Sequence, residues 1–222
     1  MQQGTRAKRA AQMTSAMRPN DDRSTDLMRA LVAGQEVALN ELMVLWEGSL
    51  LRFIFRYVQN EAQARDLVQE TFVRVYLHRK RFRPDSCFST WAFTIAANLC
   101  RNHHRWLGRH PTVSLDESTP DETTRHDKLV CPQSGPDRSA VQAERIDALQ
   151  AAVADLPHEM RTTLLLFEYE ELSYRQIATI VGCTEKGVES RLLRARTRLR
   201  QKLAVFLGAD QPARPVLMPQ RG

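Results

Sequence analysis

Apolar residues recur along most of this chain at intervals of three and four positions, which is the spacing of one face of an α-helix. No segment of useful length alternates apolar and polar residues as a half-buried β-strand does. The pattern therefore predicts helices only, in two groups. The expected helices are 25–33, 37–57 in one piece or two, 62–77 and 89–105, followed by 141–154, 158–168, 173–180 and 184–207.

Residues 107–139 separate the two groups and have no sustained apolar period, but many Pro, Gly, Ser, Thr and Asp residues. Such a composition buries too little apolar surface to order itself. The sequence therefore predicts an all-α protein of two small helical domains joined by a flexible linker, with a helix-turn-helix in the C-terminal domain. The expected organisation is a basic N-terminal extension at 1–22, a first domain at 23–106, a linker at 107–140, a second domain at 141–207 and a tail at 208–222.

Composition narrows the function. In 222 residues, 42% are hydrophobic and 26% are charged, as in an ordinary globular protein. The chain has nine glycines and no glycine-rich phosphate-binding motif, which argues against nucleotide-dependent enzymes. Its four cysteines form no C-x-x-C pair, so we expect reduced thiols, no metal site and no cofactor. The N-terminus has no apolar signal region and no apolar run approaches the roughly 18 residues of a membrane span, so we expect a cytoplasmic protein without membrane insertion.

The net charge of +6 is unevenly distributed. Residues 21–70 carry nine acids against five arginines, a net charge of −4. Residues 74–83 carry five bases and no acid, and residues 185–202 carry seven bases against two acids, so each segment has a net charge of +5. Two basic segments and one acidic segment favour an anionic polymer and a basic protein surface as partners. The alternative is that these runs are solvated helix faces.

The last two helices have the pattern of a helix-turn-helix. Ser173 and Gln176 form a capping box, and Gly182 permits a tight turn. A second helix begins near Thr184 and turns one apolar face inward. Its opposite, largely basic face suits insertion into the DNA major groove, although a helix that only covers a core has the same pattern. The candidate DNA-contacting residues are Thr184, Lys186, Glu189, Ser190, Arg191, Arg194 and Thr197.

In the segment 66–77, helical spacing places Val68, Phe72 and Val75 toward the core. The other face combines polar and acidic residues with two apolar ones, which is typical of a protein interface. Local packing of the last apolar residue at the helix end is the alternative. The candidate partner-binding residues are Asp66, Gln69, Glu70, Val73 and Leu77.

Basic residues and aromatic residues alternate in the segment that follows, a pattern found in proteins that bind single-stranded nucleic acid. Trp91 and Phe93 could equally belong to the core, so the prediction depends on the charges. An amide such as Asn98 can both donate to and accept from a base edge. The candidate residues here are Arg79, Lys80, Arg81, Arg83, Asn98, Arg101 and Arg105.

Taken together, these motifs resemble a bacterial RNA polymerase sigma factor of the extracytoplasmic-function (ECF) group. The string DLVQETFVRVY at 66–76 resembles the family's polymerase-binding segment, and FSTWAFTIAANLCRNHHR at 88–105 its promoter-melting segment. The string LSYRQIATIVGCTEKGVESRLLRARTRLRQKL at 172–203 resembles its −35-reading helix-turn-helix. The resemblance implies a non-catalytic subunit that binds core polymerase, recognises −35 and −10 promoter elements, and captures a flipped base near residues 83–88.

Two other function classes share part of this pattern. A helix-turn-helix repressor would use the second domain in the same way, but it does not account for the acidic and apolar face at 66–77. A DNA-processing enzyme would need a rigid set of reacting groups, and the densest carboxylates lie in the expected linker. Core polymerase and promoter DNA are therefore the expected partners, and an anti-sigma factor is a further candidate that the sequence does not identify.

Overall fold

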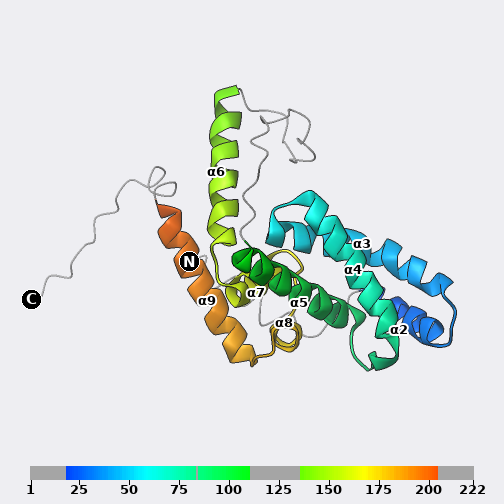
Figure 1. The fold of residues 1–222 in the computed structure, drawn as a ribbon. Coiled ribbons are helices and arrows are strands. Elements are labelled where there is room, and N and C mark those ends of the chain that lie inside the picture. Colours follow the sequence, from blue (N-terminus) through cyan, green and yellow to red (C-terminus); the bar gives the residue numbers. More distant parts are fainter. Residues whose placement is uncertain (1–18, 84, 111–135, 205–222) are drawn as a thin grey trace, which may run out of the picture.

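The structure is a computed structural model that describes residues 19–83, 85–110 and 136–204 (Figure 1). Every regular element within these ranges is a helix, and the predicted all-α fold with its C-terminal helix-turn-helix is confirmed. The expected N-terminal extension, linker and tail lie largely outside the described residues. The elements are α2 (Pro19–Val32), α3 (Val37–Val58), α4 (Glu61–Leu77), the 3-10 helix η1 (Arg79–Arg81), α5 (Phe88–Arg109), α6 (Pro136–Ala154), α7 (His158–Glu168), α8 (Tyr174–Val181) and α9 (Glu185–Lys202).

Helix α3 is the centre of the first domain, because α2, α4 and α5 all pack against it. It runs unbroken to Val58 and buries a stripe at the three-and-four spacing of one helix face. Trp46 in that stripe packs on Phe88 and Phe93 of α5, with ring centroids 5.6 and 6.5 Å apart. Its indole Nε1 donates to Ser24 Oγ of α2 at 2.8 Å. The aromatic core therefore joins α2 and α5 through α3.

The second domain contains the helix-turn-helix, formed by α8 and α9. Ser173 and Gln176 complete the expected capping box at the start of α8. Gly182 ends α8 in the left-handed conformation, with a φ of 64° that a side chain would strain. Val188 and Leu192 of α9 are buried, and α7 packs against both helices. The capping box and the glycine turn could be predicted from the sequence because each depends only on residues that are close together in the chain.

The two domains also pack against each other, α8 on α5 and α7 on α3 (Figure 1). Between α3 and α7, the Tyr57 hydroxyl and His158 Nδ1 are 2.7 Å apart. The guanidinium of Arg161 lies over the Tyr57 ring and donates through Nη1 to the Tyr57 carbonyl oxygen at 3.2 Å. These three residues form a buried polar contact between the domains, which we call the interdomain cluster.

Burial controls the protonation of the interdomain cluster. Desolvation raises the pKa of Tyr57 to about 12, so the phenol is neutral and donates its hydrogen. Desolvation also lowers the pKa of His158 to about 4, and nearby basic side chains add to the effect, namely Arg101, Arg161, His104 and Arg191. A neutral imidazole with an unprotonated Nδ1 accepts from the Tyr57 hydroxyl. Protonation of His158 would remove that acceptor.

We expect this cluster to make stability depend on pH. The pKa of His158 falls from 6.5 to about 4 on folding, so between these values the unfolded chain binds the proton more tightly. Stability present above pH 6.5 is therefore lost progressively as the pH falls toward 4. Denaturant unfolding of the full chain should show a steeper loss on acidification for the parent than for His158→Gln, which cannot be protonated. Equal losses in both proteins would contradict the prediction.

Candidate polymerase and nucleic-acid interfaces

The first candidate surface is the outer face of α4. Asn60 begins the helix by accepting from the Gln63 N–H at 2.9 Å, and the opposite face is buried in the core. The structure places all five predicted partner-binding residues along the outer face. Val73 is 49% exposed and Leu77 is 64% exposed. Leu77 therefore does not pack locally into the domain, which was the alternative explanation for an apolar residue at this helix end.

The acids on this face differ in their bonding. Glu70 accepts from Arg74 Nε at 2.7 Å, four residues along the helix. Asp66 is exposed, one turn before Glu70. The carboxylate of Glu70 is therefore shared with Arg74, while Asp66 is exposed on the same face, two turns before Val73.

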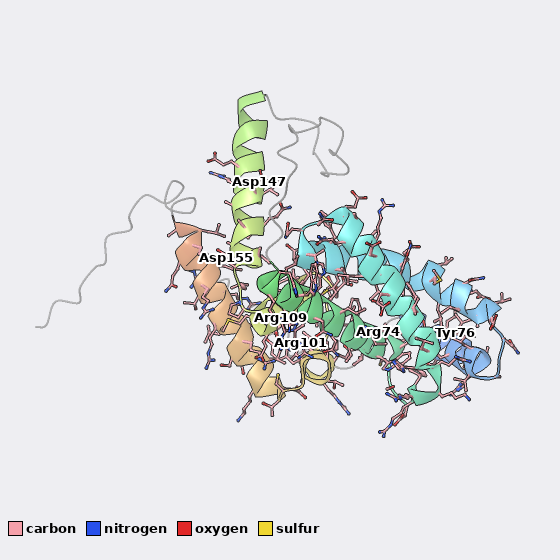
Figure 2. The ribbon with its side chains drawn as sticks, in the orientation of Figure 1. Arg74, Tyr76, Arg101, Arg109, Asp147 and Asp155 are labelled. Carbon is pink, nitrogen blue, oxygen red and sulfur yellow. The ribbon has the colours of Figure 1, made fainter. Side chains whose placement is uncertain are left out.

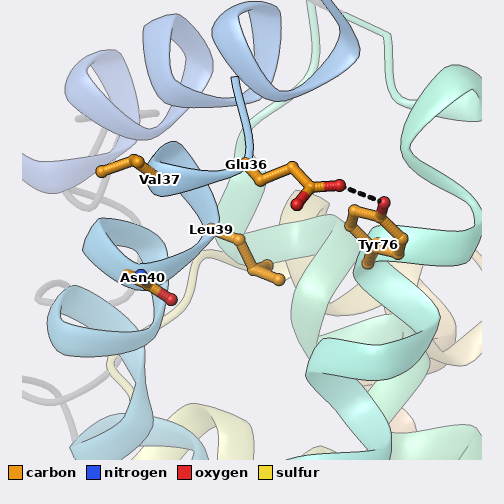
Figure 3. Close-up of a pocket in the computed structure, with 5 residues that line it drawn as sticks. All are labelled: Glu36, Val37, Leu39, Asn40 and Tyr76. Atoms are coloured by element: carbon orange, nitrogen blue, oxygen red, sulfur yellow. Dashed lines mark hydrogen bonds between the residues drawn. The ribbon is translucent and has the colours of Figure 1, made fainter. Parts of the chain in front are cut away.

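The apolar part of this surface continues past the end of α4 onto the start of α3, which sequence reasoning missed. Glu36, Val37, Leu39, Asn40 and Tyr76 line a hollow of about 490 Å³ (Figure 3). The Tyr76 hydroxyl donates to Glu36 Oε1 at 2.8 Å, and this bond raises the pKa of Tyr76. Val37 is 71% exposed. No sequence motif indicates this part of the surface, because Glu36 and Tyr76 are 40 positions apart.

The second candidate surface begins at η1, directly after α4. Lys80, Arg81 and Arg83 are exposed. Arg79 is held more firmly, because its Nη1 donates to the Tyr76 carbonyl oxygen at 2.7 Å and its guanidinium lies over the Tyr76 ring. The three exposed cations form a positively charged edge next to the start of α5.

Helix α5 continues this basic surface. Arg101 and Arg105 are exposed, and Asn98 is half-buried and accepts from Arg101 Nη2 at 2.8 Å. Figure 2 shows Arg101 on α5, and Arg74 and Tyr76 on α4. The structure thus brings Asn98, Arg101 and Arg105 onto one side of α5. The Asn98–Arg101 bond uses one lone pair of Asn98 Oδ1, so the second lone pair and the two amide N–H groups stay available to a base edge.

The aromatic residues near the start of α5 are mainly structural. Phe88 and Phe93 are fully buried. Trp91 is partly buried and packs on Phe82, with ring centroids 5.4 Å apart. The open choice between core and ligand contact is settled for Phe93, which belongs to the core, while Trp91 keeps part of its ring at the surface.

The third candidate surface is the outer face of α9. Thr184 is exposed, and its hydroxyl oxygen caps the helix by accepting from the Gly187 N–H at 3.1 Å. Lys186, Glu189, Arg194 and Thr197 are exposed, and Ser190 is half-buried. Arg191 differs from Arg194 because it is ion-paired to Glu159 of α7 at 2.7 Å and its side chain is 19% exposed. The outer face also contains Leu193, 68% exposed.

Comparison with known proteins matches two separate parts of the chain. A sigma-70 region 2 model matches residues 43–110, and a sigma-70 region 4 model matches residues 146–199. The RNA polymerase sigma-H factor of Pseudomonas aeruginosa is 31% identical over 186 residues, which is 84% of this chain and 96% of the relative. The ECF RNA polymerase sigma-E factor of Escherichia coli is 30% identical over 177 residues, 80% of this chain and 92% of the relative.

The chain belongs to the sigma-70 family, in its ECF group. It is an alternative sigma factor, a subunit that directs RNA polymerase to promoters. Two solved structures resemble this sigma factor. The sigma factor RpoE in complex with the anti-sigma factor NepR from Bartonella quintana is 25% identical, with a TM-score of 0.55, and the match covers 75% of this chain and 96% of that one. CnrH in complex with the cytosolic domain of CnrY is 21% identical, with a TM-score of 0.59 over 85% of this chain and 99% of that one, and it supports the fold alone.

The two family matches contain the predicted residues of all three candidate surfaces of this sigma factor. Helix α4, η1 and α5 lie within the region 2 match, and α8 and most of α9 lie within the region 4 match. Helix α2 precedes the region 2 match, although it packs directly against α3 and α5. In the part of the chain that the structure describes, no helix is both long and apolar enough to cross a membrane.

Proposed function

We propose that this sigma factor assigns one task to each of its three surfaces. The outer face of α4 binds core polymerase, the basic surface of η1 and α5 binds and opens the −10 element, and the outer face of α9 reads the −35 element. The observation that carries the proposal is the opposite chemistry of two neighbouring surfaces in one domain. Acids and exposed apolar side chains lie on α4, while exposed cations lie on η1 and α5.

The α4 surface suits a protein partner. Exposed Val73 and Leu77 gain stability only when another surface covers them, at roughly 25 cal/mol per Å² of apolar area buried. Asp66 and Glu70 beside them favour a basic partner and would steer its approach. These four side chains suit a basic helical surface of the polymerase better than they suit DNA, because the two carboxylates would repel the DNA phosphates.

The other two surfaces suit DNA. Lys80, Arg81, Arg101 and Arg105 would contact phosphates, and the Asn98 amide would bind the edge of an unpaired base. On α9, Arg194 can reach a guanine or a phosphate, and Glu189 can accept from a cytosine amino group. The exposed Leu193 can contact a thymine methyl group.

In this proposal each expected domain has its own task. Residues 23–106 would act on polymerase and the −10 element, residues 141–207 would read the −35 element, and residues 107–140 would join them. The tasks need binding surfaces and no reacting group, so we propose a transcription initiation factor rather than an enzyme, acting in the cytoplasm. The solved complex of RpoE with NepR supports an anti-sigma factor as a further partner.

The first prediction concerns polymerase binding. Replacing Asp66 by Lys should weaken binding of the sigma factor to core polymerase about tenfold, because the exposed charge faces a basic partner. The melting temperature should change little. Competition for core polymerase against labelled parent protein measures the effect. The control is Glu47→Lys, which makes the same charge change at an exposed position of α3. Equal binding by parent and Asp66→Lys would remove α4 from the interface.

The second prediction contrasts two arginines of α9. Arg194→Ala should weaken binding to a −35 duplex by about 1–3 kcal/mol without lowering stability, because Arg194 is exposed. Arg191→Ala should lower stability and leave base preference unchanged, because Arg191 is tied to Glu159. Binding to single-base variants of the duplex, at two salt concentrations, separates base contacts from phosphate contacts. If Arg191→Ala changes the preferred base, Arg191 leaves Glu159 when DNA binds.

The third prediction concerns promoter opening. Asn98→Ala and Arg101→Ala should reduce opening at equal promoter occupancy, because unstacking a base costs a few kcal/mol that protein contacts must offset. Permanganate reactivity of promoter thymines in the holoenzyme measures opening. The control is Arg52→Ala, which removes an exposed arginine from α3. Parental reactivity in both α5 variants would show that opening depends on other residues.

A further inference from the structure

Asp21 lies in the first turn of α2, outside both family matches, and its carboxylate is fully buried against the start of α5. Its Oδ1 accepts from the Ser89 N–H at 2.8 Å, and its Oδ2 accepts from the Ser89 hydroxyl at 2.9 Å. Ser89 is also fully buried. Both carboxylate oxygens are therefore committed to one residue of α5 that is 68 positions away in the sequence.

Helix α5 needs this contact because it has no side-chain cap of its own. The first amides of a helix have no partner within the helix, and an N-cap side chain usually accepts from the second or third of them. The N-cap residue of α5 is Cys87, whose side chain makes no such bond. Ser89 is the second residue of α5, and Asp21 accepts from its N–H. A carboxylate at this end also interacts favourably with the helix dipole.

The same contact fixes the residues that lead into α5. Phe82 before this stretch and Phe88 at its end are buried, with ring centroids 6.2 Å apart. Between them, Ser86 turns back onto Arg83, donating through its N–H and its hydroxyl to the Arg83 carbonyl oxygen at 3.0 and 2.7 Å. Ser89 comes directly after Phe88, so the bond to Asp21 holds the end of this turn against α2.

We infer that Asp21 is a positioning residue for promoter opening, which acts through Ser89 by fixing residues 85–88 and the first turn of α5. The inference rests on the proposed function, in which this part of the surface meets the unpaired base. A base is selected only if the groups around it are held within a fraction of an ångström, and a mobile first turn would lose that precision.

Other contacts hold α2 in place, so the role of the carboxylate can be tested without removing the helix. Ser24 accepts from the Trp46 indole, and the Thr25 hydroxyl donates to the backbone carbonyl of Asp21. Neither bond uses the Asp21 carboxylate. Asp21→Asn keeps the shape of the side chain and one accepting oxygen, and Ser89→Ala removes only the bond to Oδ2.

The experiment uses the full chain bound to core polymerase. At equal promoter occupancy, Asp21→Asn and Ser89→Ala should each lower the rate of promoter opening, measured by permanganate reactivity, about fivefold or more. They should also flatten the preference for one base of the −10 element, while affinity for core polymerase and for a −35 duplex stays at the parental value. The control is Asp22→Asn, which makes the same change at the neighbouring exposed residue of α2.

Parental opening and parental base preference in both variants would overturn the inference. So would a fall in opening that merely follows a loss of folded protein or of polymerase affinity, since a purely structural role predicts that result. The proposed function is tested separately by Asn98→Ala and Arg101→Ala. If those variants reduce opening and the Asp21 and Ser89 variants do not, the positioning role alone fails.

Discussion

The packing of α5 is the constraint on which the three surfaces depend. This helix is buried along about half of its circumference, against α3 and α4 on one side and α8 on the other (Figure 1). Ala92 and Ala96 are fully buried and let neighbouring helices approach closely, and Phe93 supplies apolar volume. Only the remaining half of α5 can meet DNA, and that half contains Arg101 and Arg105. A helix so firmly held can present these side chains in a fixed direction.

The net charge of a segment overstates the charge that is available to a partner. In α9, three of the cations are paired with acids of the second domain: Arg191 with Glu159, Arg196 with Glu168, and Lys202 with Asp155. These pairs hold α9 against α6 and α7. In the first domain, Arg74 is similarly paired with Glu70. The cations left for phosphates are those without such a role in the fold, such as Lys186 and Arg194, and sequence alone could not separate the two groups.

Sequence predicted the parts of the structure that depend on neighbours. The bounds of α7 match the expected helix, and the Ser173–Gln176 capping box and the Gly182 turn are where their motifs indicate. The contacts that sequence did not predict join distant positions: Asp21 to Ser89, Glu36 to Tyr76, and Tyr57 to His158. Each of these contacts joins two common polar or charged residues, and no repeating spacing in the sequence relates their positions. Only the packed helices show that an acid of α2 caps α5, and that the start of α3 extends the α4 surface.

The contact between the domains combines apolar packing with buried polar groups. Removing the apolar side chains from water stabilises the contact, whereas removing the polar groups from water costs free energy. Arg161 is 4% exposed, its Nε has no hydrogen-bond partner among the described residues, and burial lowers its pKa. Burying this cation costs free energy, which the two carbonyl oxygens that accept from it and the charge of Asp155 offset only in part. Separation of the domains would return this charge and His158 to water. The desolvated guanidinium of Arg161 therefore opposes the packing of the two domains, whereas the Tyr57–His158 hydrogen bond and the contact of Arg161 with the Tyr57 ring favour it.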